Sequence, residues 1–341
     1  MPLRPHSTER TSLLLGFALT QHCNLRCPHC IRDDVLTVQS LEPELITRTC
    51  DDALALFGDV TASFTGGEPT LHPRWNDIVS AVTARGIPYR LVTNGWHMRR
   101  MMPSFDRWPP SYVRLSLSGG NADVHDADRG HDSFRRVLLA VALLTSRQIP
   151  TGLSIVVDRR DRHQVRETAD LAESLGCLRL HYILPQPVPG SVIRDSDLAP
   201  HEWASVKQEI LAIAAEPNRR TAIQLDYGTP ADEGETEQLC DTMSLQRVYV
   251  DAAGHLSLCC QLSEYGFAST DIVADLHEVS FRDAWQRYLD AMADLRAKAA
   301  PENFSGDLAA FPCLRCAHSL GKLKWLANGS PSPWQALAAC G

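Results

Sequence analysis

Residues 13–30 read LLLGFALTQHCNLRCPHC, an apolar run followed by three closely spaced cysteines. The run Leu13–Thr20 is short and apolar, which predicts a buried β-strand. The cysteines that follow have the spacing C-x3-C-x2-C and are Cys23, Cys27 and Cys30. Three thiolates this close can bind three irons of a cubic iron–sulfur cluster, and the fourth iron is then left without a protein ligand. Such an open iron can bind a substrate or a cofactor.

A structural zinc site is the alternative for this loop. Zinc sites of that kind usually close with four ligands, often as two C-x2-C pairs. The nearest additional donors are His22 and His29, which lie inside the same tight loop. The spacing of the cysteines alone leaves both interpretations open.

The composition fits a globular enzyme. The chain has 341 residues, of which 44% are hydrophobic and 22% charged. Its net charge of -8 argues against a nucleic-acid partner, which usually requires a basic patch. No segment approaches the roughly 18 apolar residues of a membrane span, so we expect no membrane partner. Several of the eleven cysteines have metal-ligand spacing and no signal peptide is evident, so we expect a cytoplasmic protein that binds metal and lacks disulfides.

Short apolar strands alternate with helical segments between residues 10 and 200. The expected strands are Leu13–Thr20, Val60–Thr65, Tyr89–Thr93, Tyr112–Ser118, Gly152–Val157 and Leu178–Leu184. The expected helices are Leu41–Phe57, Trp75–Arg85, Phe134–Ser146 and Arg162–Leu175. Six such units predict an α/β fold, a partial (β/α)6 TIM-like barrel with right-handed crossovers. Active sites of these barrels lie at the carboxyl ends of the strands, which is where the cysteine loop follows the first strand.

Other expected strand ends also carry candidate binding residues. The second strand ends in Thr65-Gly66-Gly67-Glu68-Pro69, and paired glycines let a backbone approach a ligand closely. The third ends in Thr93-Asn94-Gly95. The fourth contains Ser116 and Ser118, and Arg129 follows shortly after it.

These motifs, in this order, resemble the radical S-adenosylmethionine (SAM) superfamily over about residues 12 to 190. The resemblance implies that the open iron binds the amino and carboxylate groups of SAM, which is then cleaved to a 5′-deoxyadenosyl radical. It implies SAM contacts from His29, Gly66, Gly67, Glu68, Asn94, Ser116, Ser118 and Arg129. Peptide-modifying members often have Asp where Ser118 stands. Arg129 is either a partner of the SAM carboxylate or a solvated loop charge.

A second cysteine set follows the expected barrel. Residues 185–235 are rich in proline, acid and glycine, which predicts a connector with one helix near Glu202–Ala215. Residues 248–259 alternate around Asp251–Gly254 and predict a β-hairpin, and a helix is expected over Ser280–Lys298. We therefore expect a radical SAM barrel over residues 1–200, a connector over 201–235 and a small hairpin and helix iron–sulfur domain over 236–341.

The cysteines of this last segment resemble those of the Twitch domain, a shortened SPASM extension. The resemblance implies an auxiliary [4Fe–4S] cluster on Cys240, Cys259, Cys313 and Cys316, and a four-cysteine zinc site is the alternative. Cys50 and Cys177 are expected to be packing residues. Cys260 is either a buried neighbour of a cluster ligand or a thiol at the barrel mouth that can donate hydrogen. Cys340 is either a thiol without a ligand role or a substitute ligand.

The resemblance extends to dehydrogenases of aminocyclitol-antibiotic biosynthesis. It implies oxidation of a secondary alcohol of an aminoglycoside-like natural product to a ketone, with the auxiliary cluster as electron acceptor. An external donor such as flavodoxin or ferredoxin would supply the first electron. The alternatives are an epimerase with a cysteine hydrogen donor and a peptide maturase that forms a crosslink. A non-enzymatic iron–sulfur carrier is the third alternative.

Overall fold

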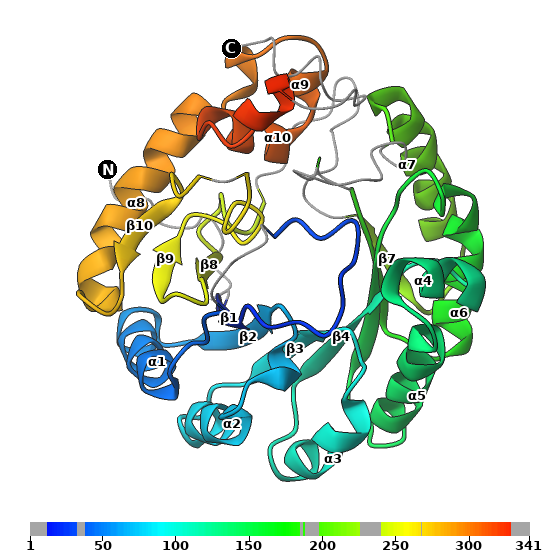
Figure 1. Ribbon diagram of the computed structural model, residues 1–341, viewed down its shortest axis with the longest axis horizontal. Helices are drawn as coiled ribbons and strands as arrows, with labels where there is room; N and C mark the ends of the chain where they lie inside the picture. Colours follow the sequence, from blue (N-terminus) through cyan, green and yellow to red (C-terminus); the bar gives the residue numbers. More distant parts are fainter. Residues whose placement is uncertain are drawn as a thin grey trace.

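A curved ten-stranded sheet, ringed by helices, organises the part of the chain described in this computed structural model, residues 12–32, 38–184, 187, 198–225, 240–266 and 268–328 (Figure 1). The strand order is β10-β9-β8-β1-β2-β3-β4-β5-β6-β7. The strands are β1 (Leu13–Thr20), β2 (Val60–Gly66), β3 (Tyr89–Thr93), β4 (Tyr112–Leu117), β5 (Thr151–Val156), β6 (Arg179–Ile183), β7 (Ala222–Leu225), β8 (Arg247–Val250), β9 (His255–Ser257) and β10 (Ile272–Asp275). The helices are α1 (Pro43–Phe57), α2 (Trp75–Ala84), α3 (Met98–Arg107), α4 (Ala122–Arg129), α5 (Ser133–Thr145), α6 (Val165–Ser174), α7 (Pro200–Ala214), α8 (Phe281–Lys298), α9 (Gly306–Ala310) and α10 (Pro312–Ser319).

The predicted partial barrel is confirmed. All six expected strands form β1 to β6, and each differs from its predicted bounds by at most one residue at either end. Consecutive strands from β1 to β7 pair in parallel, as alternating strands and helices require. Six further elements were not predicted from the sequence, namely α3, α4, β7, β10, α9 and α10.

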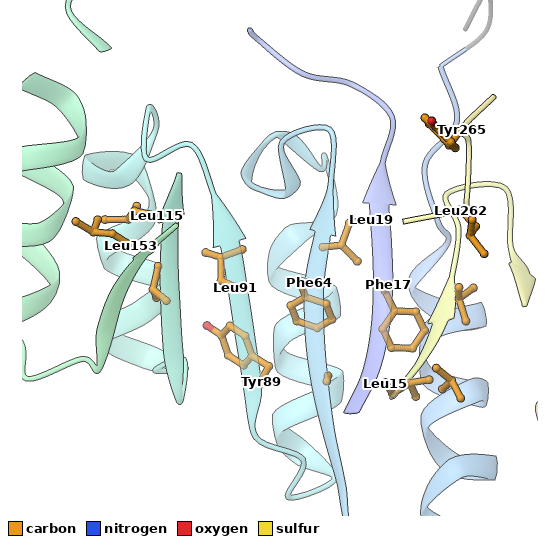
Figure 2. Close-up of a cluster of buried hydrophobic side chains, with 14 of the residues drawn as sticks. Leu15, Phe17, Leu19, Phe64, Tyr89, Leu91, Leu115, Leu153, Leu262 and Tyr265 are labelled. Carbon is orange, nitrogen blue, oxygen red and sulfur yellow. The ribbon is translucent and has the colours of Figure 1, made fainter. Parts of the chain in front are cut away.

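Strand side chains alternate between a helix-facing core and the barrel interior. On the core face Phe17, Phe64 and Tyr89 lie side by side, with ring centroids 6.3 Å and 5.4 Å apart (Figure 2). Along β4, Arg114 and Ser116 face the barrel interior, and the buried Val113, Leu115 and Leu117 face the helices. Because successive side chains point to opposite faces of a strand, the apolar core fixes which residues face the interior.

The C-terminal segment continues the same sheet. Residues 201–235, expected to be a connector, contain the helix expected near Glu202–Ala215 as most of α7, and also the unpredicted strand β7, which pairs in parallel with β6. The expected hairpin is present as β8 and β9, and β8 also pairs in parallel with β1, with Leu15 opposite Val248. Helix α8 packs against α1, where Phe57 meets Trp285 edge to face at 5.0 Å. The segment that carries the second cysteine set therefore joins the barrel sheet next to its first strand.

None of the helices within the described residues is both long enough and apolar enough to cross a membrane.

Candidate functional site

A cavity of about 320 Å³ opens at the carboxyl ends of the parallel strands. The three N-terminal cysteines, Cys23, Cys27 and Cys30, line it. Most of the predicted SAM contacts also line it, namely His29, Gly66, Gly67, Asn94, Ser116 and Arg129. The fold thus brings together residues that are up to about a hundred positions apart in the sequence. Glu68 and Ser118 are the two predicted contacts that are not among the lining residues.

The glycine pair at the end of β2 anchors the cysteine loop. The amide of Gly67 donates to the carbonyl of Thr20 at 2.7 Å, and the amide of Glu68 donates to that of His22 at 2.8 Å. A Cβ atom on Gly67 would lie only 2.4 Å from the His22 carbonyl oxygen. We expected these glycines to admit a ligand; the structure adds that they admit the backbone that precedes Cys23.

The carboxylate of Glu68 ties the ends of β2 and β3 together. It is fully buried and accepts hydrogen bonds from the Thr93 hydroxyl at 2.7 Å and the Asn94 amide at 2.8 Å. The amide and hydroxyl of Thr70 also donate to it, at 3.1 and 2.5 Å. Burial raises the pKa of this carboxyl, and these donors oppose the rise. Four donors of the protein already occupy the Glu68 carboxylate, so the side chain positions the strand ends.

Arg129 reaches the cysteine loop and is not a solvated charge. Its side chain is buried, and its Nε donates to the Ser118 hydroxyl at 2.8 Å. Its Nη1 lies 3.8 Å from the sulfur of Cys27, and its Nη2 lies 3.2 Å from Nε2 of His29. Burial raises the pKa of the Cys27 thiol, and the guanidinium of Arg129 opposes that rise. Arg129, at the end of α4, therefore places its positive charge beside the Cys27 thiol of the loop.

Two residues that the sequence analysis missed support this arrangement from behind. Asp128 lies 3.6 Å from Nδ1 of His29 and pairs with Arg160 at 2.7 Å. Arg160 also pairs with Asp158 at the end of β5. The adjacent opposite charges of Asp128 and Arg129 were the only sequence signal, and that signal does not reveal which partner each charge finds.

A third missed residue connects the two cysteine segments. Glu264, four residues after Cys260, accepts a hydrogen bond from Gln21 at 2.5 Å and pairs with Arg32 at 2.6 Å. Gln21 and Arg32 stand two residues outside the first and the last cysteine of the N-terminal loop. Glu264 itself lines the first cavity. One carboxylate therefore holds both ends of that loop.

A second cavity, of about 330 Å³, is lined by Cys240, Cys259, Cys313 and Cys316. The four thiols come from three separate segments, and apolar side chains of α8 such as Met292 and Leu295 complete the wall. The neighbouring Cys260 thiol and burial raise the pKa of Cys259, and the thiols of Cys240 and Cys313 add to the rise. Four cysteines around one largely apolar cavity suit an iron–sulfur cluster, whose irons are each held by a separate thiolate. Among the described residues, no three His, Cys, Asp or Glu side chains converge closely enough to hold a single metal ion.

The remaining cysteines separate into two kinds. Cys50 and Cys177 are buried, as expected of packing residues, and burial raises the pKa of each to about 12. Cys260 lines the first cavity, whereas its neighbour Cys259 lines the second, and Gln261 lines both. The Cys260 thiol also shares a hydrogen bond with that of Cys259, so Cys260 is a direct neighbour of an expected cluster ligand as well as a residue of the first cavity's wall. Cys340 lies outside the described residues.

Comparison with known families agrees with this site. A model of the Radical SAM superfamily matches residues 17–172. Over these residues the chain is similar to the radical SAM superfamily. The family implies a [4Fe–4S] cluster and SAM, and the described cysteine loop with its arginine and glycine supports has the thiols and the cavity for both.

Similar curated proteins act on different substrates. The AdoMet-dependent heme synthase of Methanosarcina barkeri is 27% identical over 62% of this chain and 60% of its own length. The PqqA peptide cyclase of Ruegeria pomeroyi is 25% identical over 69% and 64%. The mycofactocin maturase MftC of Mycobacterium tuberculosis is 31% identical over 51% and 45%. The chain therefore spans about half to two thirds of the length of these relatives.

Among solved structures, native anSMEcpe with bound AdoMet matches over 96% of this chain and 98% of its own. The TM-score is 0.67 and the sequence identity 16%. At that identity the match shows a shared fold, which extends through the second cysteine segment.

Proposed function

We propose that this chain is a radical SAM enzyme that modifies a peptide at an unactivated C–H bond. The observation that carries the proposal is one cavity lined by Cys23, Cys27 and Cys30 together with the supporting ends of β2, β3 and α4. When bound there, a [4Fe–4S] cluster and SAM supply a 5′-deoxyadenosyl radical that abstracts hydrogen from the substrate.

The chain's own residues hold and orient these groups. The three thiolates of the loop bind iron, and Arg129 places a positive charge beside Cys27 and the cavity. The backbone at Gly66 and Gly67 both fixes the loop and lines the cavity. This chemistry requires that water be kept from the reactive radical.

The second cavity supports an auxiliary [4Fe–4S] cluster on Cys240, Cys259, Cys313 and Cys316. All four lie around one cavity, and Gln261 belongs to the walls of both cavities. A complete set of four thiolates leaves no open iron, so this cluster would exchange electrons and would not bind substrate. An external one-electron donor such as flavodoxin or ferredoxin would supply the first electron.

A peptide substrate is favoured over the aminocyclitol that our sequence analysis preferred. Two of the three relatives described above are named for the modification of a peptide or for maturation, and none is an aminocyclitol dehydrogenase. A non-peptide substrate is the second candidate, because one of the three relatives is named as a heme synthase.

Anaerobic incubation of the reconstituted chain with SAM and dithionite tests the proposal. We expect release of 5′-deoxyadenosine and methionine, measured by liquid chromatography. The Cys27→Ala variant should release none, whereas Cys50→Ala, which removes a cysteine that lines neither cavity, should resemble the wild type. Normal SAM cleavage by Cys27→Ala would refute the site, and no cleavage by the wild type would refute the function.

A further inference from the structure

The interior of the barrel carries an excess of positive charge. Arg90 of β3 stands two residues before Val92, which lines the first cavity. Arg179 of β6 stands four residues before Ile183, which also lines it. Because side chains an even number of positions apart point to the same side of a strand, both arginines share the cavity's face of the sheet. Arg114 of β4 and Arg247 of β8 line the cavity directly. Burial lowers the pKa of Arg90, and the charges of Arg179 and Arg247 lower it further. These cations therefore repel one another inside the ring.

The same positive charges, together with burial, disfavour the protonated form of His181 on β6. Burial lowers the pKa of His181 to about 3, and the charges of Arg114, Arg179 and Arg247 contribute. Arg247 is partly compensated, because Asp241 lies 3.4 Å from it. Arg114 forms no ion pair within the described residues, and its buried Nε has no hydrogen-bond partner there. The Arg114 guanidinium is thus a cavity-facing cation whose charge is left for a ligand.

Hydroxyl groups surround this cation. Ser116 follows Arg114 by two residues on the same face of β4, and Ser154 stands directly opposite Ser116 on β5. Both serines line the first cavity. Gly152 is the register partner of Arg114, and the side chain of Tyr112 occupies the space over this glycine, so its hydroxyl lies on the same face of the sheet as Arg114. A guanidinium with nearby hydroxyl donors matches the acceptor pattern of a carboxylate, which arginine can bind through two parallel hydrogen bonds.

We propose that Arg114, with Ser116 and Ser154, binds a carboxylate of the substrate at the floor of the first cavity. The inference rests on the proposed function, because it requires a peptide that enters this cavity. The substrate would then carry an acidic side chain, or its own C-terminal carboxylate, near the reacting C–H bond. An ion pair at the floor would fix which carbon faces the SAM site, since the binding of a remote group sets the orientation of a substrate.

Three short peptides distinguish the sources of the carboxylate. Acetyl-Ala-Glu-Ala-amide carries it on a side chain, acetyl-Ala-Ala-Ala carries it at the C-terminus, and acetyl-Ala-Gln-Ala-amide carries none. Their binding to the reconstituted full chain, saturated with SAM, is measured by saturation-transfer NMR. We expect at least one carboxylate peptide to bind about tenfold or more tightly than the glutamine peptide, as a charge-assisted hydrogen bond allows.

Two variants assign that preference. Arg114→Gln should abolish it, and Arg114→Lys should keep part of it, because lysine retains the charge but loses the fork of donors. Arg99→Gln removes the same charge from an exposed position on α3 and should leave the preference unchanged. Equal binding of all three peptides, or a preference that survives in Arg114→Gln, would overturn the inference. Release of 5′-deoxyadenosine by the wild type is measured alongside, so failure of the proposed function is seen separately.

Discussion

The carboxylate of Glu264 accepts a hydrogen bond from the side-chain amide of Gln21 at 2.5 Å, across 243 positions of sequence. The same carboxylate pairs with Arg32 at 2.6 Å. Glu264 itself has a positive φ of 57°, a conformation that few residues other than glycine adopt, so the backbone is held out of its usual range where this side chain reaches across. The segment of the second cysteine set therefore braces the loop of the first.

Removal of this brace should loosen the N-terminal cysteine loop. In Glu264→Ala the loop loses hydrogen bonds to a charged group, each of which contributes about 1.5–3 kcal/mol. We expect backbone amides of residues 21–32 to exchange about tenfold faster or more, measured by hydrogen exchange and mass spectrometry. Glu209→Ala removes an exposed carboxylate of α7 and should leave the exchange unchanged. Identical exchange in both variants would show that Glu264 does not hold the loop.

Iron content tests the two cluster sites separately. Two [4Fe–4S] clusters correspond to about eight irons per chain after anaerobic reconstitution. The triple variant of Cys23, Cys27 and Cys30 to alanine should retain about four, and so should the quadruple variant of Cys240, Cys259, Cys313 and Cys316. Cys177→Ala should retain all of them, since it lines neither cavity. Stoichiometric zinc without the visible absorption of iron–sulfur clusters would contradict both assignments.

A methyl group at Gly67 should displace the cysteine loop. Its Cβ would lie 2.4 Å from the carbonyl oxygen of His22 and 2.6 Å from that of Gln21, and neither backbone atom can move independently of the loop. We expect Gly67→Ala to bind SAM about a hundredfold more weakly, as a displacement of about 1 Å in an active site can cause. Equilibrium binding of SAM to the reconstituted protein measures this.

Gly176→Ala is the matched control for that variant. A Cβ at Gly176 meets no atom within 4 Å, although the positive φ of 70° makes the backbone of an alanine there strained by about 1–2 kcal/mol. It should lower stability but leave SAM binding unchanged. Equal losses of SAM binding in the two variants would show that general instability, and not the loop, explains the effect.

Much of the barrel could be predicted from local sequence. Strands such as Leu13–Thr20 and Tyr89–Thr93 match their predicted bounds. The strands of a parallel sheet are buried on both faces, so they read in the sequence as short, nearly continuous apolar runs. The N-terminal cysteines and the glycine pair could also be placed in one site, since the carboxyl ends of parallel strands meet at one edge of a sheet.

What could not be predicted depends on contacts between distant segments. The pairing of β8 with β1 could not be predicted from the sequence. Two parallel strands are not joined by a short hairpin turn, so no local motif indicates that they are neighbours. Glu264 contacts Gln21 and Asp128 contacts His29, and both partners lie far away in the chain. No local sequence pattern indicates these contacts. β7 has a mixed burial pattern of four residues, which is too short for periodicity to identify.

A buried carboxyl behind the site should make stability depend on pH. Burial raises the pKa of Asp161 to about 8, and the nearby charge of Asp158 adds to the rise. The ordinary pKa of an aspartate is about 3.9, so between about pH 4 and 8 the folded state keeps a proton that the unfolded state releases. The free energy of unfolding should therefore fall as pH rises through this range, by up to about 1.4 kcal/mol per pH unit.

Asp161→Asn should remove that dependence. The asparagine stays neutral and its side-chain oxygen can still accept from the amide of Asp158, which donates to Asp161 at 2.7 Å. Urea unfolding at several pH values should show the variant gaining stability relative to the wild type from pH 4 to 8. Asp59→Asn, at an exposed position before β2, should follow the wild type. Parallel curves for Asp161→Asn and wild type would contradict the shift.

The fate of the substrate radical depends on Cys260. The resemblance to aminocyclitol dehydrogenases implies oxidation, in which the product is two mass units lighter and the auxiliary cluster accepts an electron. Cys260 lines the first cavity and Cys259 lines the second, and the two thiols share a hydrogen bond. A thiol in the wall of the first cavity can return a hydrogen atom to a substrate radical, and the external reductant and solvent then restore the thiol with one electron and one proton.

We therefore expect return of hydrogen from Cys260 once the peptide is identified. In heavy water the thiol exchanges its proton, so the product should be one mass unit heavier and inverted at the attacked carbon. Cys260→Ala should abolish the inverted product while 5′-deoxyadenosine is still released, because the cysteine loop that supports SAM cleavage is untouched. Iron content must match the wild type, which shows that the neighbouring ligand Cys259 stays in place. A product two mass units lighter that Cys260→Ala still forms would establish oxidation or crosslinking, with Cys260 as a bystander in the cavity wall.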